Sequence, residues 1–169
     1  MPEQAAHPTY HYTQSGLAPT SLTNIMAIES GASRTTRIVR LVIYPGNATA
    51  AGVAYLSLLR ETTAGSTNAV TASNIYNRNP NDPLFSGIIR SNGLTPGTNT
   101  ANGFFFPIPT PASSATSPAS PIVIDLSNDN NAQGLVIPQG TNNGIVFTHS
   151  GLAGAAGFSL TAVWTEWVI

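Results

Sequence analysis

The chain has 169 residues, enough for one domain, and only 8% of them are charged, with no lysine at all. Ordinary soluble domains carry about 25% charged residues, so we expect protein neighbours to cover much of this exterior. The net charge of −1, the sequence pI near 6.2 and the absence of cysteine argue against a basic nucleic-acid surface, disulfides and thiolate metal sites.

Residues 1–20 are expected to form an extended arm outside the folded domain. Three prolines disfavour a helix there, and Tyr10 and Tyr12 lie on one side of an extended chain, where they would suit docking on a neighbouring subunit. A frayed terminus is the alternative. The first residues lack the basic segment and apolar core of a signal peptide, and no apolar run reaches the roughly 18 residues of a membrane span, so neither secretory export nor a membrane partner is expected.

The remainder, residues 21–169, has the period-two pattern of short strands. Residues 36–44 are β-branched or aromatic on both faces, which predicts a central strand that ends at Pro45-Gly46. Residues 52–60 also permit a helix, but Gly52 and the threonine-rich exit favour a strand. Further strands are predicted at 22–29, 84–90, 103–108, 121–126, 135–137, 143–149 and 157–168.

A long segment in the second half of the chain and the last predicted strand add to this pattern. Residues 92–121 are rich in proline, glycine, serine and threonine, which predicts a long loop region, with the phenylalanines at 104–106 packed down. In the last strand, Phe158 and Trp164 share the apolar face, whereas Trp167 lies on the more polar face. Trp167 either caps the edge of the core or contacts a neighbouring subunit, since tryptophan is enriched at interface hot spots.

Many short strands with turn signals between them predict an all-β fold, a jelly-roll-like antiparallel β-sandwich. No repeat of fixed period is present, which disfavours a propeller or a solenoid.

Candidates for catalysis are few, and we expect no enzyme and no cofactor. His149 is followed by Ser150, but adjacent positions do not make a catalytic pair, and no Gly-x-Ser-x-Gly elbow is present. Asp82 and Glu61 would need to lie together to act as a glycosidase pair, and nothing in the sequence places them so. A Walker phosphate loop is excluded because it requires lysine.

A metal site is not expected either. His7 and His11 would share a helix face, but Pro8 disfavours a helix. Asp125 and Asp129 supply oxygen ligands for calcium, yet they lack EF-hand spacing, and such stretches usually form turns.

Four arginines lie at the start of the predicted central strand and at the end of the next strand: Arg34, Arg37, Arg40 and Arg60. One interpretation pairs them within the chain, with Glu29 and Glu61, at little gain in stability. The other pairs them with carboxylates on a partner, a geometry that the guanidinium group suits well.

Five segments of the chain resemble small virion proteins of tailed bacteriophages. These segments are RIVRL at 37–41, RETTAGS at 60–66, NPNDP at 79–83, GLVIPQG at 134–140 and AVWTE at 162–166. The family pattern has a glutamate where this chain has Thr141, so a role for that acid is not carried over. The resemblance implies a jelly-roll-like sandwich that decorates or cements the phage head, and it implies no catalytic residues.

The sequence therefore predicts a structural virion protein that bridges adjacent major capsid protein subunits, acts as a homo-oligomer with a trimer favoured, and binds neither nucleic acid nor membrane. It would be made in the cytoplasm of the host bacterium and reside on the head surface. The candidate partner contacts are Tyr10, Tyr12, Arg37, Arg40 and Trp167. The alternatives are a tail or fibre module that binds a receptor glycan, and a glycan hydrolase built on a jelly roll.

Overall fold

The computed structural model describes residues 7–71, 74–91, 93–114, 119–127 and 135–167, and these residues form eleven strands. None of the described residues belongs to a helix that is long and apolar enough to span a membrane. The strands are β1 Thr9–Leu17, β2 Thr23–Glu29, β3 Thr35–Tyr44, β4 Gly52–Glu61, β5 Tyr76–Asn77, β6 Ile88–Arg90, β7 Asn99–Thr110, β8 Ile122–Asp125, β9 Leu135–Ile137, β10 Gly144–His149 and β11 Phe158–Trp167.

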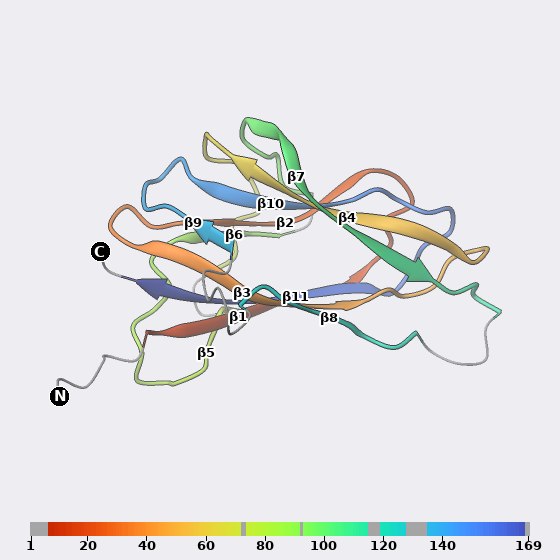
Figure 1. Ribbon diagram of the computed structural model, residues 1–169, viewed down its shortest axis with the longest axis horizontal. Coiled ribbons are helices and arrows are strands. Elements are labelled where there is room, and N and C mark those ends of the chain that lie inside the picture. The colour runs from red at the N-terminus through yellow and green to blue at the C-terminus, as the bar shows by residue number, and fades with distance from the viewer. Residues whose placement is uncertain (1–6, 72–73, 92, 115–118, 128–134, 168–169) are drawn as a thin grey trace.

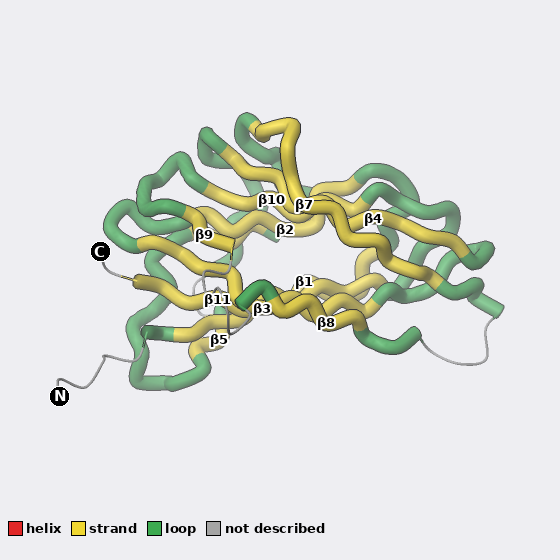
Figure 2. Tube along the Cα trace, in the orientation of Figure 1, coloured by secondary structure: helices red, strands yellow, loops and turns green. Residues whose placement is uncertain are grey.

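Two antiparallel sheets pack face to face as two layers (Figures 1 and 2). Sheet A has the order β5-β1-β11-β3-β8, and β9 pairs with β3 beyond the end of β8. Sheet B has the order β6-β2-β10-β4-β7. The predicted all-β sandwich is confirmed, and residues 52–60 lie in a strand, as expected.

The strand pairing follows the order of a jelly roll. β1 pairs with β11, β2 with β10, β3 with β8 and β9, and β4 with β7. The first half of the chain thus runs antiparallel to the second half, like one long hairpin, and this hairpin is rolled so that β1, β2, β3 and β4 alternate between the two sheets. That arrangement is the jelly-roll topology found among capsid and lectin domains.

Side-chain alternation explains how the layers close. In β11, every second side chain is buried between the sheets and the others face outward. β10 is buried along its whole length because it lies in the middle of sheet B. Its outer side is covered by Leu94, which forms a small apolar cluster with Ala27 and Val146. Residues of the β4–β7 connection thus cover part of the outer face of sheet B.

The structure corrects the expectation that residues 1–20 form an arm outside the sandwich. Residues 9–17 are strand β1, which lies between β5 and β11 inside sheet A. Tyr10 is fully buried in the core, where its ring lies 5.5 Å from that of Phe85 and 6.0 Å from that of Trp164. Tyr10 and Tyr12 lie on one side of the strand, as expected, but the apolar surface that receives Tyr10 belongs to the same chain. Residues 1–6 lie outside the described residues.

The expected loop at 92–121 also differs from the structure. Its centre is β7, the longest of the eleven strands described and an edge strand of sheet B. Pro107 and Pro109 are exposed there, which suits an edge strand because proline has no N–H to donate. Phe104 and Phe105 are 57% and 61% exposed, so the expectation that this cluster packs down is wrong for both. Residues 115–118 of this segment lie outside the described residues.

Candidate functional site

The outer face of sheet A is a surface that spans the strands β1, β11, β3 and β8. Because the buried side chains of β11 alternate with the others, Thr161, Val163, Thr165 and Trp167 face outward, half-exposed. Cross-strand neighbours extend this surface over β1, β3 and β8. It comprises His7, Thr9, His11, Thr13, Arg37, Arg40, Val42, Tyr44, Val123, Asp125, Ser159, Thr161, Val163, Thr165 and Trp167, and none of these side chains is fully buried.

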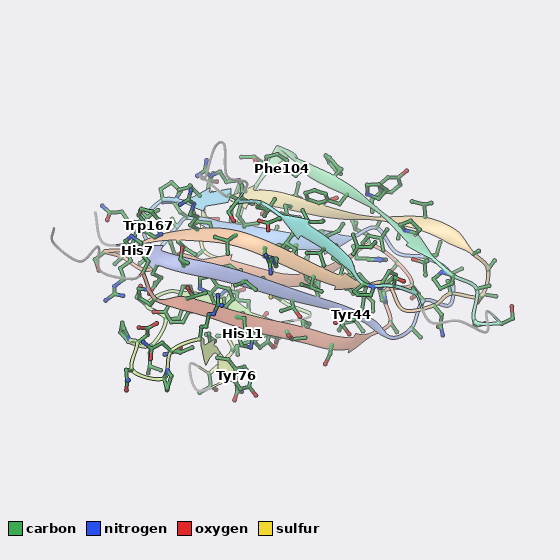
Figure 3. The ribbon with its side chains drawn as sticks, turned by 60° about the horizontal axis from the view of Figure 1, so that its bottom comes forward. His7, His11, Tyr44, Tyr76, Phe104 and Trp167 are labelled. Carbon is green, nitrogen blue, oxygen red and sulfur yellow. The ribbon has the colours of Figure 1, made fainter. Side chains whose placement is uncertain are left out.

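An aromatic group occupies the end of this face where β11 finishes (Figure 3). The rings of His7 and Trp167 stack with centroids 3.8 Å apart and planes at 12°. The guanidinium carbon of Arg37 lies 5.2 Å from the centroid of the same indole, within the range of a cation–π contact. The indole N–H donates to Thr165 Oγ1 at 3.0 Å. These contacts hold Trp167 on the face, outside the core.

The opposite margin of the face carries an ion pair. Arg40 Nη2 donates to Asp125 Oδ2 at 3.1 Å, with both side chains about half exposed. The backbone N–H of Ser127 and the Arg40 guanidinium hold the pKa of Asp125 below its ordinary value. Such an exposed pair adds little to stability. Beside it, Val42 lies opposite Val123, which is exposed.

Two further aromatic residues border the face. Tyr76 of β5 stacks on His11 of β1, with ring centroids 5.2 Å apart, and Tyr44 lies at the far end of β3 (Figure 3). Both tyrosines are exposed. Large aromatic side chains around a half-polar surface are typical of protein recognition sites.

Three of the five predicted contact residues meet on this face. Arg37 lies opposite Thr165, Arg40 lies opposite Val163, and Trp167 completes the same surface. Tyr12 points inward from β1 and packs against the core, and its hydroxyl donates to Gln14 Oε1 at 3.2 Å. Tyr10 is buried and unavailable to a partner.

The sequence pattern indicated His7 and His11 only as candidate metal ligands, and it indicated no role for Tyr76. The register of β1 against β11 was the missing information, because it places both histidines beside outward-facing residues. The alternation around Tyr10 was the available signal: if Tyr10 faces the core, then His11 faces out.

The arginines divide between the two interpretations offered by the sequence. Arg34 pairs with the buried Glu166 at 3.4 Å, and Arg90, rather than any of the four arginines singled out, pairs with Glu29 at 2.7 Å. Among the described residues, no carboxylate lies within ion-pair distance of Arg37 or Arg60. Pairing of these two with a partner stays a prediction.

Several buried ionisable groups connect distant parts of the chain through hydrogen bonds. Glu166 accepts hydrogen bonds from the Tyr10 hydroxyl at 3.2 Å and the Ser86 N–H at 3.1 Å, which joins β1 and the segment before β6 to the end of β11. Burial, with the charge of Glu166, raises the pKa of Tyr10 well above its ordinary value. His149 is buried, and its Nδ1 accepts from the Gly151 N–H at 2.9 Å.

The residues weighed as catalytic or metal-binding candidates are not gathered in the part of the chain that the structure describes. The charges that act on the pKa of Glu61 are those of Glu29 and Arg90, whereas the charge of Asp82 acts on the pKa of Tyr10. Glu61 and Asp82 thus have different charged neighbours. No group of three or more histidine, aspartate or glutamate side chains is placed to hold a metal among these residues. Asp129 lies outside the described residues, so the calcium hypothesis for Asp125 and Asp129 remains open.

No protein family model matches this chain, and no curated protein matches it either. The outer face of sheet A and the sequence motifs are the features of this molecule that bear on its function.

Proposed function

We propose that this protein is a structural component of a tailed-bacteriophage virion that decorates the head and cements it by bridging adjacent major capsid protein subunits. The observation that carries the proposal is the outer face of sheet A. It spans four strands, its charged side chains are Arg37, Arg40 and Asp125, and it presents Trp167 beside His7. A surface of this composition suits contact with another protein.

The virion assignment is supported by the phage-like motifs at 37–41 and 162–166, which lie on β3 and β11. These two strands are neighbours in sheet A and contribute Arg37, Arg40 and Trp167 to its outer face. Two of the five segments that resemble virion proteins therefore lie on the strands of the surface proposed for attachment.

The edges of the sheets favour attachment through faces and side chains rather than through an added strand. β5, β6, β8 and β9 have two to four residues each, and β7 carries two prolines. Short or proline-containing edge strands oppose pairing with a foreign strand. Copies of the protein, as a homotrimer in our proposal, would attach at several points at once, and multivalent attachment resists separation of the shell far better than one contact.

The experiment is to strip this protein from phage heads and to add purified variants back. Trp167→Ala should lower the affinity for stripped heads by about 2 kcal/mol, in the range of an interface hot spot, and should reduce the heat resistance that wild-type protein restores. The matched control is Leu22→Ala, which removes an exposed apolar side chain from the turn before β2 and should bind like wild type.

Two outcomes would overturn the proposal. Stripped heads that keep full heat and pressure resistance would contradict the cementing role. A handful of copies per particle, rather than hundreds, would favour the tail or fibre module that binds a receptor glycan.

A further inference from the structure

A small groove opens where the long edge strand β7 passes the short strand β9 of the other sheet. Its volume is about 180 Å³, and its walls come from β4, β7, β9 and β10. The apolar part consists of Leu58, Phe104, Leu135, Val136 and Ile145.

In the part of the chain that the structure describes, the groove lies at an edge where the two sheets are not closed over each other. Phe104 lies opposite Leu58 and belongs to the same row of β7 as the buried Ile108, the row that faces the other sheet. Among the described residues, the part of the other sheet that lines the groove is β9, which has three residues. More than half of the Phe104 side chain therefore stays exposed, away from the His11–Tyr76 pair (Figure 3).

The size of the groove selects the kind of ligand. Small-molecule sites occupy about 300–1,000 Å³, which is larger than this volume. A space of 180 Å³ suits one large side chain of a partner, in the manner of an anchor residue that fills a pocket at an interface.

Arg60 supplies the charge of the groove. It is the charged residue among those that line it, and it is exposed at the end of β4, opposite Ile145. No carboxylate of the described residues pairs with it, whereas the exposed Arg40 is paired with Asp125. An unpaired guanidinium beside an apolar pocket is complementary to a carboxylate, which it binds through two parallel hydrogen bonds.

We propose that this groove receives an apolar side chain of a partner protein that carries a carboxylate next to it. The apolar side chain enters between Phe104 and Val136, and the carboxylate pairs with Arg60. This contact would be a second attachment point, separate from the outer face of sheet A. It rests on the proposed function only in taking the partner to be a protein.

The test uses the full-length, isotope-labelled protein and a small probe that contains both groups. Isocaproate has a branched apolar chain and a carboxylate, and isocaproamide has the same chain without the charge. In an NMR titration, isocaproate should shift the signals of Arg60, Phe104 and Val136, with an affinity about three- to fivefold higher than that of isocaproamide.

Two substitutions make the test specific. Arg60→Gln should lower the affinity for isocaproate to that of isocaproamide. The matched control is Arg78→Gln, since Arg78 is exposed, lies outside the groove and has no ion pair among the described residues. It should leave the affinity for isocaproate unchanged.

Absence of shifts at the groove, equal affinity for the two probes, or equal effects of the two substitutions would each overturn this inference. The probe does not depend on phage heads, so this failure is distinct from failure of the proposed function. Isocaproate binding by a protein that does not bind stripped heads would uphold the groove and reject the cementing role.

Discussion

At the scale of single residues, the buried ionisable groups decide how the molecule responds to pH. His149 and Glu61 are both almost inaccessible to water, and burial is the main cause of the pKa shift in each. The shifts have opposite directions because burial penalises the charged form, which is the protonated form of histidine and the deprotonated form of glutamate. Each group therefore destabilises the fold at one side of the pH range.

His149 should make the protein sensitive to acid. Burial lowers its pKa from 6.5 to about 4, so its stabilising contribution is complete above pH 6.5 and is lost as the pH falls towards about 4. The loss should reach about 3 kcal/mol, at about 1.4 kcal/mol per pKa unit. His149→Asn keeps an acceptor for the Gly151 N–H and should remove this part of the slope in urea unfolding at several pH values.

The control for that measurement is His11→Asn, which removes a histidine from the outer face of sheet A. A slope that is unchanged in His149→Asn, or lost equally in His11→Asn, would show that the acid sensitivity has another origin.

Glu61 should have the opposite effect. Its Oε1 accepts from the Gly97 N–H at 2.8 Å, but Oε2 is buried with no hydrogen-bond partner among the described residues. Burial raises its pKa above 4.5, and the charge of Glu29 adds to the shift. The contribution of Glu61 to stability is therefore complete below pH 4.5 and is lost as the pH rises through the raised pKa. Glu61→Gln should raise the free energy of unfolding at neutral pH by about 1 kcal/mol.

Glu29→Gln is the informative comparison, because both glutamates flank Gly144 in sheet B. Glu29 accepts from Arg90 Nε at 2.7 Å and from Arg90 Nη2 at 3.1 Å, so its loss leaves a buried guanidinium uncompensated. We expect it to lower the free energy of unfolding by about 3 kcal/mol. If both substitutions lower the free energy of unfolding equally in chemical unfolding, the charge of Glu61 stabilises the fold, and the prediction for Glu61→Gln is wrong.

At the scale of elements, β1 and β11 form the part of sheet A that joins the core to the proposed attachment surface. Their inward row contributes Tyr10 and Trp164 to the core, and their outward row contributes His11 and Trp167 to the outer face. Deletion of either strand therefore removes core side chains as well as side chains of the outer face, so we expect it to lower the stability of the fold as well as to change the surface.

Deletion of residues 1–16 should accordingly prevent folding rather than merely weaken attachment. Loss of a large buried aromatic side chain such as Tyr10 costs about 3–5 kcal/mol by itself, against a total stability of about 5–15 kcal/mol for a typical domain. A thermal melt followed by circular dichroism should show no cooperative transition.

Deletion of residues 1–6 is the control, since it leaves β1 whole, and it should melt cooperatively. If the protein without residues 1–16 melts at the wild-type temperature yet fails to bind stripped heads, this segment is an attachment arm and not a part of the core.

At the scale of the whole molecule, the scarcity of charge determines how it meets other proteins. Among the described residues, three of the six arginines pair with acids of the same chain, which leaves few charges to steer a partner. Uncharged side chains, Trp167 and Phe104 among them, make up the rest of both proposed attachment points.

Attachment to stripped heads should therefore depend only weakly on salt. We expect the affinity to fall by less than about tenfold between about 0.05 M and about 0.5 M salt, because screening acts mainly on exposed charge pairs. Sedimentation of heads with bound protein at several salt concentrations measures this. A much steeper loss would indicate that charged groups, rather than the apolar surfaces, dominate the contact.

Sequence by itself determined the class of fold and most of the strands, because the alternation of side chains is a local property. The period of two in residues 157–168 predicted β11 and its buried row, and Pro45-Gly46 marked the end of β3. A glycine is required at that turn, since Gly46 has φ +70° and a Cβ would lie 2.1 Å from the Ala156 carbonyl oxygen.

Only the tertiary structure decided what each face meets. Alternation places Tyr10 and Tyr12 on one side of the chain, but it does not say whether that side meets the core of the same molecule or a neighbour. In the same way, Phe104 belongs to the row that faces the opposite sheet, yet it is exposed beside the three-residue strand β9. Partners such as Arg34 and Glu166, 132 residues apart, come together through the register of strands. Register depends on packing across the whole sheet, which no local pattern encodes.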